Sequence, residues 1–203
     1  HGLFVATNVS LLAGSSMLLM KKFDAEAICR RMPQTSVLMG VPTFYVRLLG
    51  NNTLKNTAEK MRLFVSGSAP MLPQTHALWK ELTGQVILER YGMTETSMNT
   101  SNPYFGERRA GTVGIPLPGI EVIVTDPITG KVLQDGRTGM IEIRGPNVFK
   151  GYWGMPEKTA EELRENGFFI TGDLGTISED GYVSIVGRSK DLIISGGYNI
   201  YPK

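Results

Sequence analysis

Short apolar runs, each ended by Gly, Pro or a polar turn, dominate the first half of the chain. The runs Val37–Val41, Leu63–Ser66 and Val86–Glu89 have the continuous apolar character of strands that are buried on both faces. Helical patterns over residues 43–49 and 74–82 separate these runs. Since strands that alternate with helices form parallel sheets, the pattern predicts an α/β fold with a parallel sheet flanked by helices.

The pattern of residues 3–32 predicts two helices and one further strand. Residues 3–20 are apolar with small residues interspersed, which predicts a buried helix that runs into a strand near residues 16–20. Asp24 is placed to cap a helix over residues 25–32, because its carboxylate can accept a backbone N–H of the first turn. We expect His76, on the 74–82 helix, to be solvated.

After about Gly114 the pattern changes to short β-rich runs at 122–124, 140–143 and 182–186. Turn signals at 129–130, 135–136 and 180–181 join them, with one short helix near 157–165. This texture predicts a small antiparallel barrel or sheet. We therefore expect an α/β subdomain over residues 1–115, a β-barrel subdomain over 116–187, and a hinge with the start of another domain over 188–203.

Composition narrows the function classes. The net charge of the 203 residues is only +2 and the basic residues are scattered, so we expect neither a nucleic-acid nor an anionic-membrane partner. The apolar stretches are shorter than a membrane span, and no signal peptide is visible. The single cysteine excludes an internal disulfide, which suits the cytoplasm. The abrupt ends at His1 and Lys203 predict a fragment.

Two segments that follow strands have the composition of a nucleotide site. Ser66-Gly67-Ser68-Ala69-Pro70 precedes a helix, so its backbone amides are suited to cradle an anion; the alternative is a plain Gly-Ser connection. Glu89–Thr96 combines an aromatic ring, a glycine, hydroxyls and carboxylates, which suits a base, a phosphate and Mg²⁺. Polar strand ends without function look similar.

Two later segments carry a carboxylate and a flexible connection. Phe168–Asp173 ends a β run in a carboxylate that can accept hydrogen bonds from a ribose diol, or can simply close a turn. Gly187–Tyr198 begins with charged residues and ends in paired glycines, which is typical of a hinge and also of a surface hairpin.

In this order, the four segments resemble the adenylate-forming superfamily of acyl-CoA synthetases, peptide-synthetase adenylation domains and luciferases, over nearly the whole chain. The resemblance implies that a carboxylic acid and ATP give an acyl-adenylate, whose acyl group coenzyme A then accepts. It also implies ATP/AMP, Mg²⁺ and coenzyme A as cofactors, and turns at Ser66, Tyr91, Asp173 and Arg188 that converge on one adenylate.

The resemblance gives roles to individual residues. The residues expected to border the adenine and acyl pocket are Gly67, Ser68, Ala69 and Pro70. Tyr91, in the segment Glu89, Arg90, Tyr91, Gly92 and Met93, is expected to stack on adenine. Thr94 is expected to contact the phosphate and Glu95 to hold Mg²⁺, while Asp173 and Arg188 bind the ribose.

The same resemblance implies a moving C-terminal domain. Lys190 is expected to be its pivot, and Gly196 and Gly197 to begin that domain and flank the pantetheine tunnel. The family's phosphate loop and a late catalytic lysine have no counterpart in these 203 residues. Because that lysine stabilises developing charge, we expect the isolated fragment to be a poor enzyme.

The amino-acid sequence of residues 39–47 and 89–103 resembles that of the bacterial malonyl-CoA synthetases. A dicarboxylate keeps its second charge after activation, so its pocket needs a cation; Arg47 is the candidate and Arg62 the runner-up. A solvated Arg47 is the alternative. Met93 is expected to press on the acid's α-carbon, and His1 to orient its carboxylate.

Two further hypotheses remain open. One keeps adenylation but changes the acid to a fatty or aryl acid, or the acceptor to a carrier-protein thiol. The other is a nucleotide-binding scaffold without catalysis.

Overall fold

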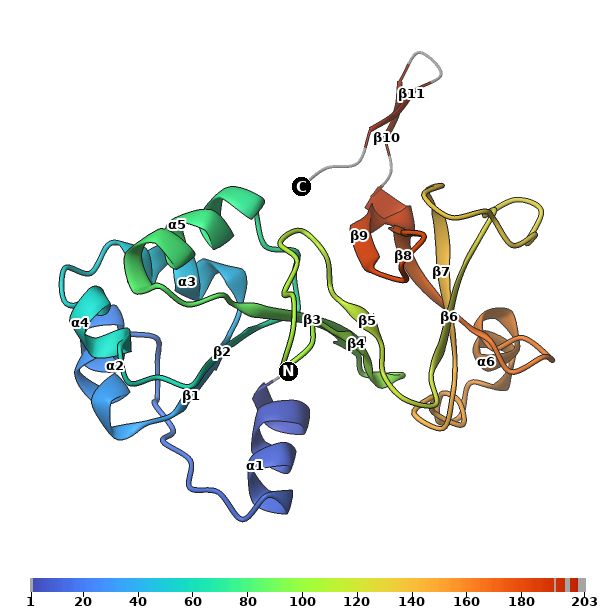
Figure 1. Ribbon diagram of the computed structural model, residues 1–203. Coiled ribbons are helices and arrows are strands. Elements are labelled where there is room, and N and C mark those ends of the chain that lie inside the picture. The colour runs from blue at the N-terminus through green and yellow to red at the C-terminus, as the bar shows by residue number, and fades with distance from the viewer. Residues whose placement is uncertain (1, 192, 196–197, 201–203) are drawn as a thin grey trace. The chain divides into compact units, whose positions relative to one another are not determined.

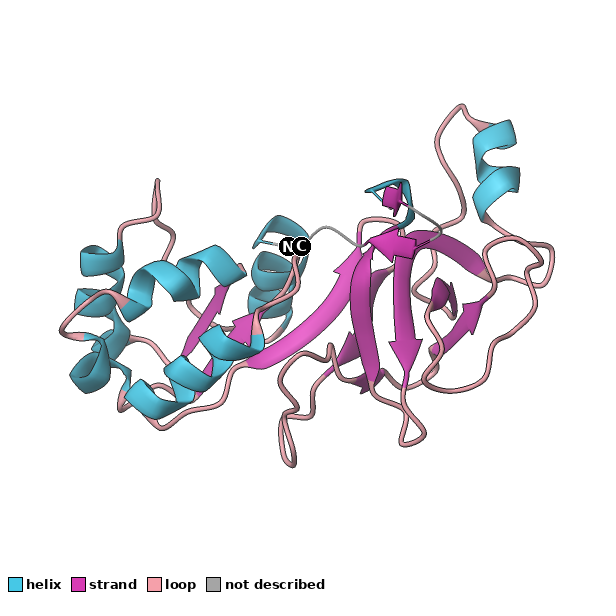
Figure 2. Ribbon diagram, turned by 90° about the horizontal axis from the view of Figure 1, so that it is seen from above, coloured by secondary structure: helices cyan, strands magenta, loops and turns pink. Residues whose placement is uncertain are grey.

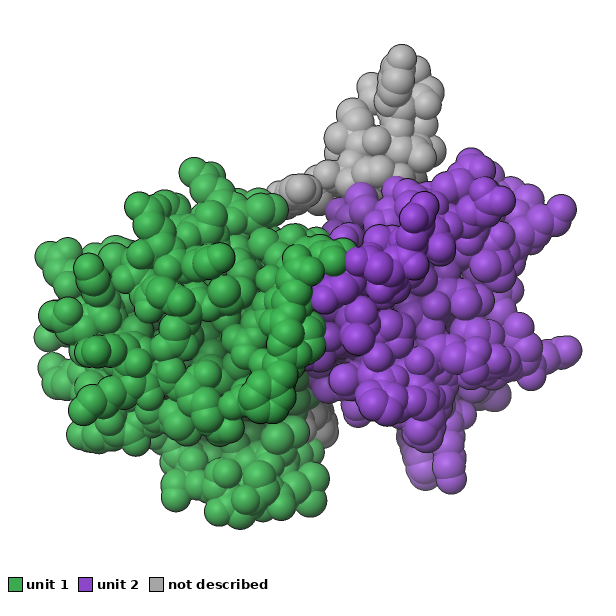
Figure 3. Space-filling model, viewed as in Figure 1, with its two compact units in different colours: residues 1–91, 102–111 green, residues 92–101, 112–203 purple. Residues whose placement is uncertain are grey.

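The computed structural model describes the backbone of residues 2–191, 193–195 and 198–200, and the side chains of residues 5–191. The chain divides into two compact units (Figure 3). Unit 1 comprises residues 1–91 and 102–111, and unit 2 comprises residues 92–101 and 112–203. The expected subdomains at 1–115, 116–187 and 188–203 are a different division and stay a prediction.

Unit 1 contains the predicted parallel strands. β1 (Val37–Gly40) pairs in parallel with β2 (Leu63–Ser66), and β2 pairs in parallel with β3 (Leu88–Met93), whose last two residues belong to unit 2. The helices that accompany these strands in Figure 1 are α2 (Ala25–Arg31), α3 (Pro42–Leu49), α4 (Leu54–Ala58) and α5 (Pro73–Thr83). The α/β fold predicted from the alternation of strands and helices is confirmed.

Aromatic side chains form the centre of the unit 1 core. Trp79 of α5 is fully buried and meets the rings of Tyr45 and Phe64 edge to face. The hydroxyl of Tyr45 donates to the carbonyl oxygen of Val65 at 2.7 Å, and burial raises the pKa of Tyr45. This packing fixes α3 and α5 on β2, and so fixes both ends of the loop over residues 66–70.

The predicted strand near residues 16–20 is wrong. The chain instead forms a π-helical turn, η1 (Gly2–Thr7), and α1 (Asn8–Leu12), after which residues 15–20 have no regular structure. No residue of α1 is buried, and Leu12 is 90% exposed. A strand needs a neighbour for its backbone hydrogen bonds, and an apolar sequence alone does not supply one. The predicted cap is confirmed, since Asp24 accepts from the N–H of Ala27 at 2.9 Å.

Unit 2 contains antiparallel strands. β4 (Ser97–Ser101) pairs with β5 (Ile115–Pro116). A second sheet has the order β6 (Glu121–Thr125), β7 (Gly139–Arg144), β8 (Phe169–Ile177) and β9 (Val183–Arg188), with α6 (Pro156–Glu162) between β7 and β8 in sequence. Figure 2 shows the strands of the chain in magenta and the helices in cyan. The antiparallel sheet is confirmed. Closure into a barrel is not shown, because β6 and β9 are the two edges of this order.

The sheet of unit 2 contains a buried charge that is fully paired, and its turns are tight. Glu142 of β7 is 1% exposed; its two oxygens accept from the guanidinium of Arg164 at 2.7 Å each, and Thr125 also donates to it. The predicted turns contain Gly130, Gly136 and Gly181 at positive φ.

The chain then continues as η3 (Ser189–Asp191) and a hairpin of β10 (Ile193–Ser195) and β11 (Tyr198–Ile200). In the described part of the chain, no helix combines the length and the apolar character that a membrane span requires.

Candidate functional site

The turn between β3 and β4 carries two predicted site residues. β3 continues to Met93, so the expectation that the strand ends at Glu89 is wrong, and only residues 94–96 form the turn. Gly92 lies so close to Ser97 that a Cβ atom would collide with the Ser97 carbonyl oxygen, which explains why glycine stands here. Ser97 itself has a φ of 52°. The turn thus presents Thr94, which is exposed, and Glu95, which is half-buried.

A loop about 50 residues later holds this turn in place. The side-chain amide of Asn147 donates to the carbonyl oxygen of Thr96 at 2.6 Å, and the N–H of Phe149 donates to the carbonyl oxygen of Glu95 at 2.8 Å. Sequence reasoning missed both residues, because neither type carries a chemical signature and the contact is long-range. The available signal was the polar Asn within a segment of glycine, proline and aromatic residues.

The Glu95 carboxylate has a specific partner. The hydroxyl of Tyr152 contacts Glu95 Oε1 at 3.2 Å and Glu162 Oε2 at 2.7 Å. Among the described residues, no group of three or more His, Cys, Asp or Glu side chains is placed to hold a metal ion. Mg²⁺ bound with a nucleotide takes one or two carboxylates, phosphate oxygens and water, so a single accessible carboxylate at a turn fits that ion.

Asp173 and Arg188 lie together, as the ribose-binding interpretation requires. They are directly paired residues of β8 and β9, and Arg188 Nε lies 2.9 Å from Asp173 Oδ1. Asp173 is 5% exposed, and its N–H donates to the hydroxyl of Thr171. The expectation that Asp173 ends a strand is wrong, because β8 continues to Ile177. A register shift after Leu174 marks a bulge beside Asp173.

The loop after β2 is a smaller anion cradle than predicted. The N–H of Gly67 already donates to the carbonyl oxygen of Gly40 at 3.3 Å, and Pro70 has no N–H. α5 begins only at Pro73, so the loop is not itself the helix N-terminus. Ser68 and Ala69 are exposed, and Ser68 has the strained φ of 70°.

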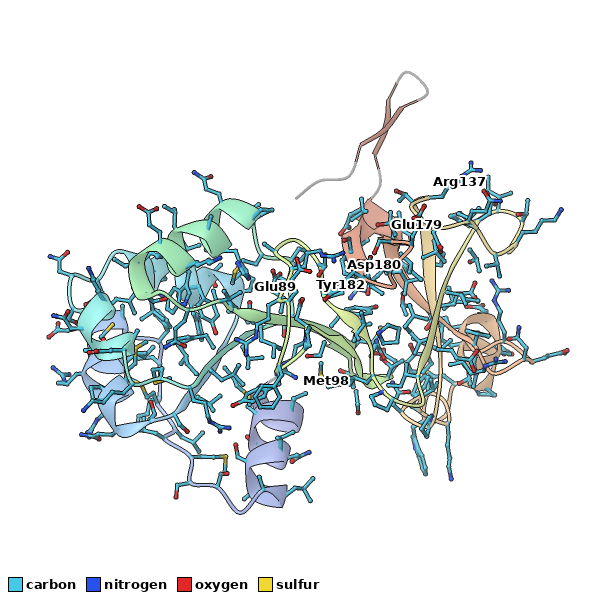
Figure 4. The ribbon with its side chains drawn as sticks, in the orientation of Figure 1. Glu89, Met98, Arg137, Glu179, Asp180 and Tyr182 are labelled. Carbon is cyan, nitrogen blue, oxygen red and sulfur yellow. The ribbon has the colours of Figure 1, made fainter. Side chains whose placement is uncertain are left out.

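Buried polar residues support the start of β3 in unit 1. Glu89, labelled in Figure 4, is 4% exposed; burial raises its pKa to about 7, although the N–H groups of Gly111 and Met71 oppose the shift. The expectation that His76 is solvated is wrong, since it is 5% exposed and donates from Nε2 to the Ile87 carbonyl oxygen at 3.0 Å.

Glu89 and His76 are 4.0 Å apart at their nearest atoms. Burial lowers the pKa of His76, so near pH 7 the imidazole is neutral while the Glu89 carboxyl is partly protonated. We therefore interpret this contact as a polar pair and not as an ion pair. The adjacent Arg90 is also buried, which lowers its pKa, while Tyr91 and Met93 are half-buried.

The two candidate cations for a second carboxylate are both exposed. Arg47 on α3 places its guanidinium 4.2 Å from the centre of the Phe23 ring, a cation–π geometry. Arg62 donates to the hydroxyl of Tyr104 at 3.4 Å. Stacking fixes the direction of the Arg47 side chain without neutralising its charge.

The remaining predicted residues belong to the ends of the chain. Lys190 is exposed in η3. His1, Gly196 and Gly197 lie outside the described residues, so their expected roles stay predictions.

Comparisons with known proteins give the family of this chain. The family model described as AMP-binding enzyme matches residues 1–153. The chain is 39% identical to a malonate–CoA ligase of Arabidopsis thaliana, over 98% of this chain and 36% of that protein. It is 35% identical to a long-chain-fatty-acid–CoA ligase of Bacillus subtilis (strain 168), over 100% of this chain and 37% of that protein.

Solved structures give the same family. ATP-bound MatB from Rhodopseudomonas palustris superposes with a TM-score of 0.96 at 62% identity, covering 100% of this chain and 40% of that one. A malonyl-CoA ligase in complex with methylmalonyl-CoA and AMP has a TM-score of 0.85 at 42% identity, covering 99% and 44%. The chain thus spans less than half the length of these relatives. It belongs to the AMP-binding enzyme family.

Proposed function

We propose that the full-length protein is an AMP-forming acid–CoA ligase that activates malonate with ATP and transfers the malonyl group to coenzyme A. The observation that carries this proposal is the 62% identity to ATP-bound MatB across the whole of this chain. Further support comes from the malonyl-CoA ligase complex, which contains both a CoA thioester and AMP, the two products expected of such an enzyme.

Within the proposed reaction, the chain's residues bind and orient ATP. Tyr91 offers an aromatic face to adenine; Ser68, Ala69 and Pro70 border the adenine and acyl pocket, and Thr94 offers a hydroxyl to the α-phosphate. Asp173, paired with Arg188, has the acceptor oxygens that a ribose diol needs. Holding the α-phosphorus near the acid carboxylate replaces a bimolecular encounter by an oriented one.

Glu95 is the residue proposed to hold Mg²⁺. The ion, when bound, neutralises charge on the phosphates and on the departing pyrophosphate. The contribution of the chain is to fix the Glu95 turn through Asn147 and Phe149 before the nucleotide arrives. Such preorganisation lowers the cost of assembling the charged complex.

We also propose roles for the C-terminal residues of the chain and for the sheet of unit 2. Lys190 acts as the pivot of a C-terminal domain that packs near residues 188–203, and Gly196 and Gly197 line the path of pantetheine. The sheet of unit 2 is part of a barrel subdomain in the complete enzyme. Since the phosphate loop and the late lysine act in the adenylation step, the 203-residue fragment alone has little or no activity.

Malonate is favoured over other acids by charge. The second carboxylate of malonate needs a cation, and Arg47 keeps its charge while its direction is set by Phe23. The second candidate is a longer fatty acid, which the 35% identity to a long-chain-fatty-acid–CoA ligase supports. A fatty acid would leave the cation without its carboxylate partner.

The assignment of malonate as the acid substrate is tested with the full-length gene product. Its kcat/KM is compared for malonate, acetate and octanoate, before and after Arg47→Ala. We expect malonate to be preferred and the variant to lose at least about tenfold with malonate alone, as for a lost charged hydrogen bond. Arg30→Ala is the matched control, because Arg30 is also an exposed helix arginine. Preference for octanoate, or an unaffected Arg47→Ala variant, would overturn the assignment of the acid.

A further inference from the structure

The hydroxyl of Tyr152 is shared by two carboxylates. It lies 2.7 Å from Glu162 Oε2 and 3.2 Å from Glu95 Oε1. A phenol has one proton to donate, so it cannot form a full hydrogen bond with both acceptors at once. The distances give the stronger bond to Glu162 and the weaker one to Glu95.

Glu162 is held firmly as the competing acceptor. Lys158 Nζ lies 2.6 Å from its Oε1, one turn earlier on α6. Burial alone would raise the pKa of Glu162, but the hydrogen bonds from Lys158 and Tyr152 and the charges of Lys158 and Lys190 outweigh it and lower the pKa. Glu162 is therefore ionised at neutral pH and remains a strong acceptor for the Tyr152 hydroxyl proton.

Tyr152 itself has little freedom to move away. Its ring meets the ring of Phe149 edge to face at 4.8 Å, and its N–H donates to the hydroxyl of Thr159 on α6 at 2.9 Å. Phe149 also donates its N–H to the Glu95 backbone. The Tyr152 side chain and the Glu95 turn are thus anchored to the same short segment.

We propose that Tyr152 is a positioning residue for Glu95, and that Glu162 limits the share of the hydroxyl proton that Glu95 receives. This inference rests on the proposed role of Glu95 as the carboxylate that holds Mg²⁺ of the bound nucleotide. A weak hydrogen bond orients Glu95 without engaging its charge fully, and the carboxylate stays available to a cation. A strong bond would orient it equally well but would compete with the ion.

The test is the Mg²⁺ dependence of nucleotide binding, measured by calorimetry on the full-length gene product with α,β-methylene-ATP. Tyr152→Phe keeps the ring and removes the hydroxyl. We expect it to weaken the apparent Mg²⁺ affinity about three- to tenfold, the factor that one net hydrogen bond supplies. Binding of AMP without Mg²⁺ stays unchanged. Tyr104→Phe, which removes a hydroxyl whose contact is with Arg62, is the control and leaves both quantities unchanged.

A second variant tests the competition. In Glu162→Gln the new amide can donate to the phenol oxygen of Tyr152, so the phenol donates its own proton to Glu95 alone. Because this stronger hydrogen bond competes with the ion for the Glu95 carboxylate, we expect the apparent Mg²⁺ affinity to fall. Because this effect passes through the hydroxyl, Glu162→Gln causes little further loss in the Tyr152→Phe background. Independent, additive losses would overturn the coupling.

Failure of this inference is distinguishable from failure of the proposed function. If Glu95→Gln leaves the Mg²⁺ dependence unchanged, the assigned role of Glu95 is wrong. If Glu95→Gln weakens it and the folded Tyr152→Phe variant does not, Tyr152 has no positioning role. Thermal unfolding of each variant shows that the protein measured is folded.

Discussion

Arg188 and Asp173 face each other across β8 and β9, with the Arg188 Nε atom 2.9 Å from the Asp173 carboxylate. The carboxylate is buried, whereas the arginine side chain is 55% exposed. An ion pair with so exposed a partner contributes little to stability, and a buried charged acceptor is costly to maintain. This imbalance is expected where a carboxylate is kept for a ligand.

Replacing Asp173 by Asn removes the charged acceptor proposed for the ribose. We expect AMP binding to weaken by about ten- to a hundredfold, since hydrogen bonds to charged groups contribute about 1.5–3 kcal/mol. Calorimetric titration with AMP measures the affinity of each variant. Glu121→Gln is the matched control, because Glu121 pairs with Arg144 across β6 and β7 and has no proposed ligand. Equal losses in both variants would show a general effect on the sheet.

Replacing Gly92 by Ala tests the geometry of the Glu95 turn. The added Cβ atom would collide with the carbonyl oxygen of Ser97. This oxygen cannot easily shift, because Ser97 belongs to the backbone of β4. We expect a loss of about 1–3 kcal/mol in the free energy of unfolding, together with weaker Mg²⁺-dependent nucleotide binding. Gly50→Ala is the control, because its Cβ atom would meet only the Arg47 carbonyl oxygen at an ordinary 3.6 Å. A Gly92→Ala variant as stable as wild type would contradict the close approach of Gly92 to Ser97.

Glu89 predicts a specific dependence of stability on pH. Its pKa rises from 4.5 to about 7 on folding, so between these values the folded state binds more protons than the unfolded state. The stabilising contribution is present in full below pH 4.5 and is lost as the pH rises through about 7. Relative to Glu89→Gln, wild type should lose roughly 3 kcal/mol of unfolding free energy over this range.

Urea unfolding at pH 4.5, 6 and 8 measures this difference. His76 changes stability in the opposite direction, because its lowered pKa favours the neutral form, but it is present in both proteins and largely cancels. A difference between wild type and Glu89→Gln that is independent of pH would show that Glu89 is not buried as described.

The sequence pattern predicted the parts of the fold that local chemistry controls. β2 over Leu63–Ser66, the Asp24 cap and the glycine turns follow from apolar runs, capping and positive φ, all of which act within a few residues. The predicted strand at 16–20 failed, because an apolar run cannot specify which neighbour covers it. His76 failed similarly: its burial depends on the Ile87 carbonyl oxygen, eleven residues away.

The candidate site was predictable only where residue type carries the chemistry. Glu95 and Asp173 were singled out as carboxylates that follow β runs, whereas the role of Arg188 was implied only by the resemblance to the adenylate-forming superfamily; the structure brings Asp173 and Arg188 together. Asn147 and Tyr152 were missed, because their importance lies in long-range hydrogen bonds that hold the Glu95 turn. Positioning groups of this kind become visible only when the turn and the later loop are folded.

The proposed activity is tested most directly by product analysis of the full-length gene product with malonate, ATP, Mg²⁺ and coenzyme A. We expect malonyl-CoA and AMP in equal amounts, with pyrophosphate, and no AMP when malonate is omitted. Nucleotide binding without AMP formation would instead indicate a non-catalytic scaffold, and formation of ADP in place of AMP would contradict adenylation.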